Sequence, residues 1–297
     1  DMTWNDDLAL MRRELLADPE WLAVRDSIVE GLAVGKRRSE DLLGCSGDAP
    51  APGCDVEVRF QRIGIRTRQP IQVFLEVVMG FEVAQASPLV VGLNLVAPET
   101  DAVALRDYAL HMRMFGEMSA FYPGVPVALH AGEMTDAQAV ELDAQDHLPL
   151  AIGDPQAGGA GARRVGHGVA LDAAIGRAAL LEQMKREGIA VELNLRSNAL
   201  LLGVTGASHP LPDYLEAGVP IVLSTDDPGM MGTGLREQFL LAAGFEEVSY
   251  RDLKQFARNS IEFSFLEAAD RSRLAERLER ELAAFEAVQA GYAMSDR

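Results

Sequence analysis

The sequence predicts an α/β fold, a TIM-type (β/α)8 barrel with extra helices, of which about six strands lie in this chain. Its 297 residues, 48% of them hydrophobic, suffice for one such barrel, which needs about 250 residues. Short runs rich in β-branched residues alternate with helical patterns, which is typical of repeated βα units and a parallel sheet. Several runs are apolar almost throughout, as expected of strands covered on both faces. No break in composition divides residues 1–297, so we expect a single domain.

The individual elements follow from the spacing of apolar residues. Residues 5–43 have apolar side chains at helical spacing and predict two N-terminal helices. The barrel follows over about 54–235, and the charged, amphipathic segment 236–293 predicts C-terminal helices. The six predicted strands are 55–60, 89–95, 125–130, 163–168, 189–195 and 219–225. The helices predicted between them are 71–86, 103–121, 172–187 and 211–217, with a glycine-rich loop at 153–162.

The charge of the chain argues against two classes of partner. Asp and Glu number 45 against 27 Lys and Arg, which gives a net charge of −18 and leaves no basic stripe for a phosphate backbone. Nucleic acid and anionic membranes are therefore not expected as partners. No apolar run approaches the roughly 20 residues that a membrane helix needs. A small molecule is the expected partner.

Cys45 and Cys54 are the only cysteines, and the turn-rich stretch CSGDAPAPGC between them could bring the two sulfurs together. The alternative is two unrelated thiols in a reducing compartment. A disulfide would favour a periplasmic or secreted location, and free thiols would favour the cytoplasm.

Potential metal ligands and acid–base groups stand at the ends of three predicted strands. His130 ends the run VPVALH, His167 lies within RVGHG, and Asp226 and Asp227 follow VPIVLST. Because the carboxyl ends of the strands in a barrel share one face, we expect these side chains to converge. Imidazole nitrogen and carboxylate oxygen are the usual ligands of a catalytic Zn²⁺, which activates water. Taken singly, each residue also has a structural explanation, such as a helix cap for the aspartates of TDDP.

Two further candidates follow His130 in the stretch VALHAGEMT. Glu133 could carry a proton to a substrate, or it could be an ordinary acidic residue in the first turn of a helix. Gly132 lacks a side chain and lets a ligand approach the backbone, so it is a candidate substrate-binding residue. The other histidines are predicted to have supporting roles, structural for His111 and His147, and fixing a loop near the site for His209.

Five ordered motifs resemble the adenosine deaminase group of the metal-dependent amidohydrolase superfamily. They are HAGE at 130–133, RVGHG at 164–168, SN at 197–198, HPLPDYLEAGVP at 209–220 and STDDPGM at 224–230. The resemblance implies a zinc-dependent hydrolase that converts adenosine or 2'-deoxyadenosine to inosine and ammonia. Two alternatives stay open: deamination of another aminopurine, such as a modified adenosine or a free base, and a non-catalytic purine-binding or signalling barrel.

The resemblance also implies a role for each matching residue. His130 and Asp226 would be ligands of one Zn²⁺ ion. Glu133 would donate a proton to the ring nitrogen next to the amino-bearing carbon, and His167 would orient the attacking hydroxide. Asp227 would hold the imidazole side of the purine.

Two departures from the family pattern qualify these roles. The family's first strand carries a His-x-His pair that supplies two more zinc ligands, and this sequence has no His-x-His. We therefore expect two barrel strands, with this pair, upstream of residue 1. Many members have glycine where this chain has Ala97, at a point where the backbone N–H contacts the purine, and Pro98 removes the next donor. The sequence therefore does not decide between adenosine and another aminopurine.

Overall fold

The computed structural model describes residues 6–295 and contains six parallel strands in chain order. The strands are β1 (Phe60–Ile65), β2 (Val90–Val96), β3 (Ala128–Ala131), β4 (Arg164–His167), β5 (Ala190–Leu193) and β6 (Ile221–Leu223). β1 pairs with β2, and β3 to β6 pair in sequence. A single parallel bridge between Leu93 and Val127 connects the two sets. All six carboxyl ends therefore point the same way.

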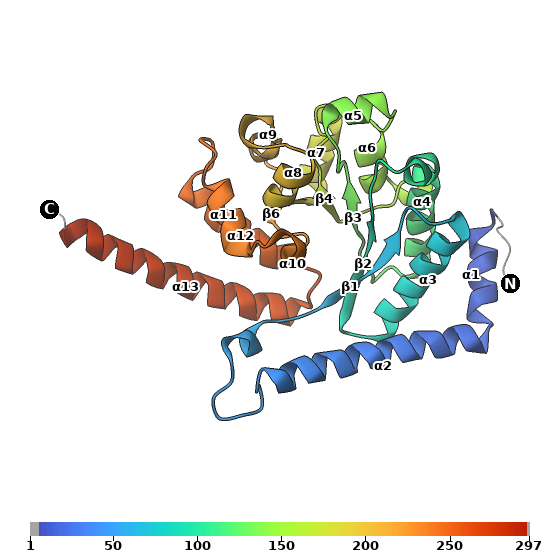
Figure 1. Cartoon of the computed structure of the whole chain (residues 1–297), viewed down its shortest axis with the longest axis horizontal. Coiled ribbons are helices and arrows are strands. Elements are labelled where there is room, and N and C mark those ends of the chain that lie inside the picture. Colours follow the sequence, from blue (N-terminus) through green and yellow to red (C-terminus); the bar gives the residue numbers. More distant parts are fainter. Residues whose placement is uncertain (1–5, 296–297) are drawn as a thin grey trace.

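Helices surround this sheet, as repeated βα units require (Figure 1). α3 packs on β1 and β2, α6 packs on β3, and α12 packs on β6. The helices after the N-terminal pair are α3 (Pro70–Ala86), α4 (Ala102–Phe121), α5 (Asp136–Glu141), α6 (His147–Ile152), α7 (Arg177–Glu187), α8 (Leu195–Leu201), α9 (Leu211–Ala217), α10 (Pro228–Met231), α11 (Leu235–Ala242), α12 (Tyr250–Glu262) and α13 (Ala268–Ser295). The long α13 packs on α12, and its C-terminal end projects beyond the other helices (Figure 1).

The N-terminal segment forms two helices, as predicted, α1 (Leu8–Leu16) and α2 (Pro19–Leu42). Asp7 and Asp18 cap them by accepting backbone N–H groups of the first turn. α2 runs along one side of the molecule, beneath β1 and α3 in the view of Figure 1. Its apolar residues pack on a small cluster formed by α3 and β2; they are Trp21, Ile28, Val29 and Leu32.

The sheet is open within residues 6–295. β1 and β6 each pair with one strand there, so the six strands form a curved parallel sheet with two free edges. The prediction of about six parallel strands alternating with helices is confirmed, and the closed eight-stranded barrel stays a prediction. No helix in the described part of the chain is long and apolar enough to cross a membrane.

Two predicted elements begin five residues before the observed ones, and the others differ by three residues or fewer at either end. The prediction of a strand at 55–60 is wrong. The observed strand β1 pairs with β2 only from Phe60 onward and continues to Ile65. The residues before Phe60 alternate apolar and charged, but Val56 and Val58 are 63% and 44% exposed. Their charged neighbours bind α13 instead, through an ion pair between Arg59 and Asp270. The helix predicted at 172–187 begins only at Arg177, because turns occupy residues 172–176.

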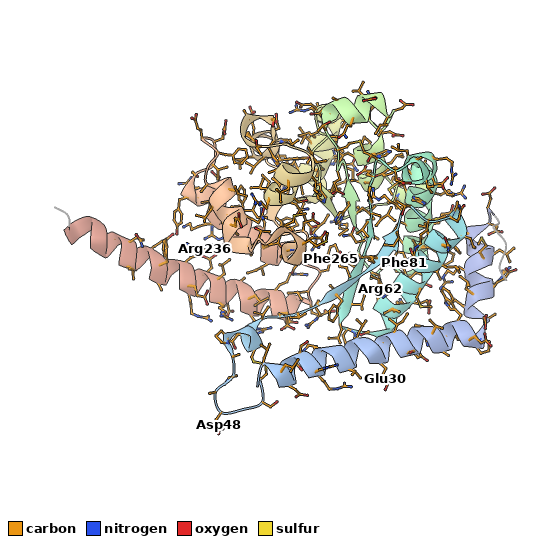
Figure 2. All side chains as sticks on the ribbon, viewed as in Figure 1. Glu30, Asp48, Arg62, Phe81, Arg236 and Phe265 are labelled. Atoms are coloured by element: carbon orange, nitrogen blue, oxygen red, sulfur yellow. A yellow bond between two sulfur atoms is a disulfide. The ribbon has the colours of Figure 1, made fainter. Side chains whose placement is uncertain are left out.

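A disulfide joins Cys45 and Cys54 in the loop between α2 and β1. Figure 2 shows Asp48 at the tip of this loop, away from the sheet. The pairing that the sequence allowed is therefore present, and it closes a loop far from the strand ends that carry His130 and His167.

We predict that Gly116→Ala destabilises the fold by about 1–3 kcal/mol. A methyl group at this position of α4 would overlap the carbonyl oxygen of Gly159 and would lie 3.2 Å from the Cα of Pro155, so α4 and the 153–162 loop would have to separate. Gly35→Ala is the control, because nothing lies within 4 Å of the added methyl group in the middle of α2. Urea denaturation should show Gly35→Ala at least as stable as the wild type. Equal stability of both variants would contradict the close packing of α4.

Candidate functional site

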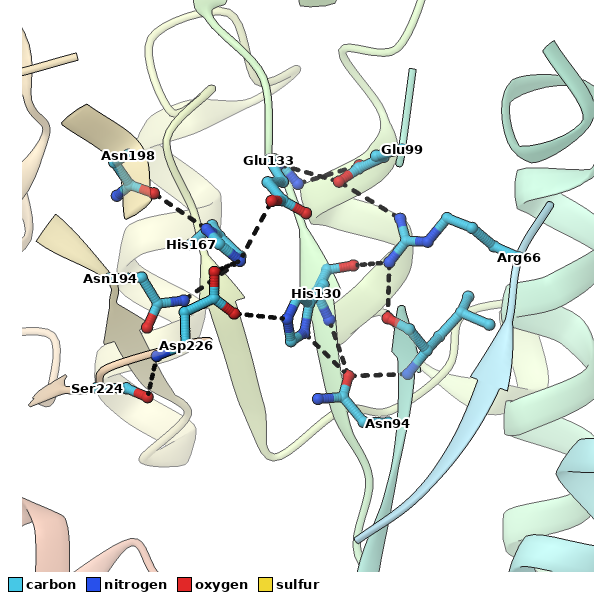
Figure 3. Close-up of polar contacts among 12 residues, drawn as sticks. Arg66, Asn94, Glu99, His130, Glu133, His167, Asn194, Asn198, Ser224 and Asp226 are labelled. Atoms are coloured by element: carbon cyan, nitrogen blue, oxygen red, sulfur yellow. Dashed lines mark hydrogen bonds and ion pairs between the residues drawn. The ribbon is translucent and has the colours of Figure 1, made fainter. Parts of the chain in front are cut away.

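His130, His167 and Asp226 meet at the carboxyl ends of the strands (Figure 3). His130 is the third residue of β3, His167 ends β4, and Asp226 follows β6 by three residues. Nε2 of His130 lies 3.6 Å from Oδ1 of Asp226, and Nε2 of His167 lies 3.9 Å from Oδ2 of the same carboxylate. One potential ligand atom from each residue lies within 4.8 Å of the others. The structure thus brings together three residues that span 96 positions of the sequence, from His130 to Asp226.

The backbone is strained at three positions around this site. Ala97, His167 and Asp226 have φ angles of 82°, 69° and 56°, in the left-handed region that favours glycine. Each lies at the end of a strand or just beyond it, where the chain turns from the sheet into the following segment. Such strain costs about 1–3 kcal/mol per residue and typically gathers at functional sites. It supports a function for this face of the sheet.

Asn94 of β2 fixes the orientation of His130. Its side-chain Oδ1 accepts the backbone N–H groups of Leu95 at 2.8 Å and of His130 at 3.2 Å. Since both donors are unambiguous, this atom is the amide oxygen, and it can only accept from the Nδ1 of His130, 3.1 Å away. The imidazole proton is therefore on Nδ1, and the lone pair of Nε2 points toward Asp226. This arrangement prepares a histidine to bind a metal.

Asp226 is ionised in this environment. Burial alone would raise its pKa, but the neighbouring imidazoles of His130 and His167 outweigh burial and lower the pKa to about 2. The side chain is 13% exposed and faces the site. An anionic carboxylate beside a free imidazole lone pair is a donor set that fits Zn²⁺.

A buried ion pair holds the turn that carries Glu133. Arg66 and Glu99, both fully buried, have Nη1 and Oε2 3.4 Å apart. The carboxylate of Glu99 accepts the backbone N–H of Gly132 at 3.0 Å and that of Glu133 at 2.9 Å. Nη2 of Arg66 donates to the carbonyl oxygen of His130 at 2.5 Å. The backbone from His130 to Glu133 is thus fixed at both ends (Figure 3).

His147 completes this buried cluster. Its Nδ1 lies 2.6 Å from Oε1 of Glu99, and its ring stacks on Tyr108 with the ring centres 3.5 Å apart. Burial would raise the pKa of Glu99, but the hydrogen bond with His147 and the charge of Arg66 lower it to about 2. These contacts agree with the supporting role expected of His147.

Glu133 itself points into the site. Its Oε1 lies 3.6 Å from Nε2 of His167, and its side chain is 18% exposed. His167 is fully buried, and burial lowers its pKa below the usual value of 6.5, so its ring is neutral at pH 7. Two carboxylates, Glu133 and Asp226, therefore face the same nitrogen of His167.

The site opens into a cavity of about 720 Å³, large enough for a small ligand. Ala97, Glu133 and Asp227 are among the residues that line it. Asp227 is exposed and stands at the N-cap of α10, but its side chain makes no capping hydrogen bond there. Its carboxylate is therefore available to a ligand. The N–H of Gly132 is donated to Glu99, so a substrate-binding role for Gly132 stays a prediction.

Sequence reasoning did not identify Asn94, Arg66 and Glu99, although all three position the site. Asn94 is the one polar side chain in the apolar run VVGLNLV, which was the available signal. Arg66 and Glu99 stand just after β1 and β2, at the same face as His130. Nothing in their local sequence distinguishes them from ordinary loop residues.

We predict that Glu99→Gln weakens the acid dependence of stability. Because the pKa of Glu99 lies at about 2 in the folded chain, below its ordinary value of 4.5, its stabilising effect is complete above about pH 4.5 and is lost as the pH falls toward about 2. Chemical denaturation across this range should show a shallower decline for Glu99→Gln. Near pH 7 the variant should be less stable by about 3–5 kcal/mol, because the charge of Arg66 is left unpaired.

The control for this experiment is Glu216→Gln, which removes an exposed carboxylate on α9. Its stability should decline with pH in parallel with the wild type. A decline equally steep in Glu99→Gln would show that Glu99 does not titrate as described.

Comparison with known proteins identifies relatives that cover most of the chain. An adenosine deaminase family model matches residues 13–281. An adenine deaminase from Sinorhizobium fredii is 30% identical over 250 residues, which make up 84% of this chain and 66% of that protein. The chain thus spans just under two thirds of the length of this relative.

Two solved structures have a similar fold. The adenine deaminase from Arthrobacter aurescens superimposes with a TM-score of 0.62 at 20% identity, over 93% of this chain and 78% of that one. An amidohydrolase from Burkholderia ambifaria, solved with bound zinc, gives a TM-score of 0.58 at 19% identity, over 80% of this chain and 61% of that one. At these identities the likeness concerns the fold. Because the family model covers most of its length, this chain belongs to the adenosine deaminase family.

Proposed function

We propose that the protein catalyses the zinc-dependent hydrolytic deamination of adenosine or 2'-deoxyadenosine, which releases ammonia and leaves inosine or its 2'-deoxy form. The observation that carries this proposal is the convergence of His130, Glu133 and Asp226 at one cavity, with the buried His167 in contact with Glu133 and Asp226. Nitrogen and oxygen metal donors, a carboxylate and a buried imidazole are the groups that hydrolysis of an aromatic C–N bond requires.

We assign His130 and Asp226 to the metal. Nε2 of His130 has a free lone pair because Asn94 accepts the proton on Nδ1, and Asp226 is ionised. Bound Zn²⁺ would lower the pKa of a water molecule and so supply a nucleophile near neutral pH. Two protein ligands are fewer than the three that a catalytic zinc usually takes. We propose that two more strands close the sheet between β1 and β6 and bring further ligands to this end.

The remaining side chains act on the purine. Glu133 holds the proton that the ring nitrogen next to the amino-bearing carbon takes up during attack, which makes the ring accept a nucleophile. His167, held 3.6 Å from Glu133, orients the attacking oxygen. Asp227 lines the cavity without a capping bond and accepts a hydrogen bond from the imidazole side of the purine. Ala97, which lines the cavity, presents backbone atoms to the ring, and Gly132 precedes Glu133 in the turn after β3.

Free adenine is the second candidate substrate. Pro98 has no N–H to offer beside Ala97, so one donor to the purine is lost at this corner of the cavity. The relatives from Sinorhizobium fredii and Arthrobacter aurescens are both adenine deaminases, which supports this candidate independently.

The substrate is tested by a panel of aminopurines. Protein from the full reading frame that contains these 297 residues should be loaded with Zn²⁺ and mixed separately with adenosine, 2'-deoxyadenosine and adenine. We expect ultraviolet absorbance to fall with the nucleosides, ammonia to appear, and a chelator to abolish both. Turnover of adenine alone would favour the second candidate, and no turnover of any of the three would contradict aminopurine deamination.

The role of Glu133 separates an enzyme from a purine-binding protein. Glu133→Gln keeps the size and polarity of the side chain but removes the ionisable group, so turnover should fall by about 10²–10⁴-fold while purine affinity changes little. Glu141→Gln, the same change at an exposed position of α5, is the control and should keep full turnover. Equal loss of turnover and binding in Glu133→Gln would argue against its catalytic role.

A further inference from the structure

A chain of buried side chains leads from the start of α9 to the site. The backbone N–H of Leu211 donates to Nδ1 of His209 at 3.1 Å. Nε2 of His209 lies 2.9 Å from the side-chain amide of Asn198, and the same amide lies 3.0 Å from Nδ1 of His167. All three side chains are at most 2% exposed. Among the described residues they link a helix terminus to the imidazole beside Glu133.

The direction of the hydrogen bonds in this chain is determined at the His209 end. A backbone N–H can only donate, so Nδ1 of His209 is the acceptor and carries no proton. Burial lowers the pKa of His209 to about 4, so the ring is neutral at pH 7. A neutral imidazole has one proton, which must then be on Nε2. His209 therefore donates to Asn198.

The amide of Asn198 must receive this proton with its oxygen. If its nitrogen faced His209, two N–H groups would oppose each other, unless the imidazole lost both protons. Half a turn of the amide exchanges oxygen and nitrogen without moving their positions. The amide oxygen then accepts from His209, and the amide N–H donates to Nδ1 of His167. Because Nδ1 of His167 accepts this N–H and carries no proton, the proton of the ring is on Nε2.

The surroundings of His167 at the other end favour the same arrangement. Its Nε2 faces Glu133 at 3.6 Å and Asp226 at 3.9 Å, and both are acceptors when ionised. An N–H on Nε2 of His167 is attracted to these carboxyl oxygens. The side-chain amide of Asn194 lies 3.2 Å away and can turn its oxygen, which is otherwise unpaired in the described structure, toward this N–H. The carboxyl groups beside Nε2 therefore agree with the direction that His209 sets, and Asn194 is compatible with it once its amide is turned.

We propose that His209 and Asn198 are positioning residues that hold His167 in the tautomer protonated on Nε2. His167 then faces the site as a hydrogen-bond donor, and in its neutral form it offers no lone pair there to a metal or to a proton. The inference rests on the proposed function for its catalytic meaning. It assigns His167 to holding an oxygen nucleophile by donating to it, and leaves metal binding on this side to His130 and Asp226.

The test is long-range ¹H–¹⁵N NMR of the chain labelled with ¹⁵N-histidine, near pH 7.5. The sequence has five histidines, so each imidazole can be assigned. The spectrum distinguishes protonated from bare nitrogen in each ring without substrate or turnover. We expect the proton on Nε2 in both His167 and His209. A proton on Nδ1 of His167 would overturn the proposal.

Asn198→Asp tests the link. A carboxylate can only accept, so it should keep the proton of His209 on Nε2 but draw a proton to Nδ1 of His167. An unchanged His167 spectrum in this variant would overturn the role of Asn198. His209→Phe should raise the fraction of His167 protonated on Nδ1, and no rise would overturn the role of His209. His111→Phe is the matched control, since it also replaces a fully buried histidine and should leave His167 unaltered.

The NMR spectrum reports the histidine tautomers independently of catalytic activity. Failure of the deamination assay with the expected tautomers would leave this inference intact and remove the proposed reaction. Active enzyme with His167 protonated on Nδ1 would leave the reaction intact and remove the inference.

Discussion

The ion pair between Arg66 and Glu99 is the contact on which the geometry of the site depends. Arg66 follows β1, Glu99 follows β2, and together they bind the backbone of the turn after β3. Burying two charges costs several kcal/mol per ion, and hydrogen bonds to the two charged groups offset this cost. Here the carboxylate accepts two backbone N–H groups and contacts His147, and Nη2 of the guanidinium donates to two carbonyl oxygens, whereas its Nε and Nη1 have no hydrogen-bond partner in the described structure. The ion pair therefore holds the backbone of the turn after β3 in one position.

Side-chain amides determine which ring nitrogen carries the proton in the histidines of the site. Asn94 sets the proton of His130, and Asn198 sets that of His167, each through a single hydrogen bond to Nδ1. Two chemically identical rings, 4.8 Å apart, are thereby made different: one presents a lone pair to the site and the other an N–H. An amide is suited to this because it has both a donor and an acceptor and does not titrate.

The sequence predicted the arrangement of the sheet and of the residues that end its strands, but not their supports. Apolar, β-branched runs identify strands, and parallel topology alone brings His130, His167 and Asp226 to one face. The alternation before Phe60 was misleading, because charged residues that bind α13 produce the same pattern as a half-buried strand. The roles of Arg66 and Glu99 could not be predicted from the neighbouring sequence. Their roles depend on a contact between two residues that lie 33 positions apart in the sequence.

The distribution of charge at this site favours the binding of a cation. Asp226 is ionised and 13% exposed, Glu133 lies nearby at 18%, and the chain as a whole has a net charge of −18. An ionised Asp226 next to a second, partly buried carboxyl group concentrates negative charge at this end of the sheet. A divalent ion held by His130 and Asp226 would balance this charge, and binding it would favour the folded state over the unfolded one. The positive φ of His167 and Asp226 adds about 1–3 kcal/mol per residue to the cost of holding this site in place. Binding of a cation by Asp226 would offset part of that cost, so stability and chemistry at this end of the sheet would be coupled through the bound charge.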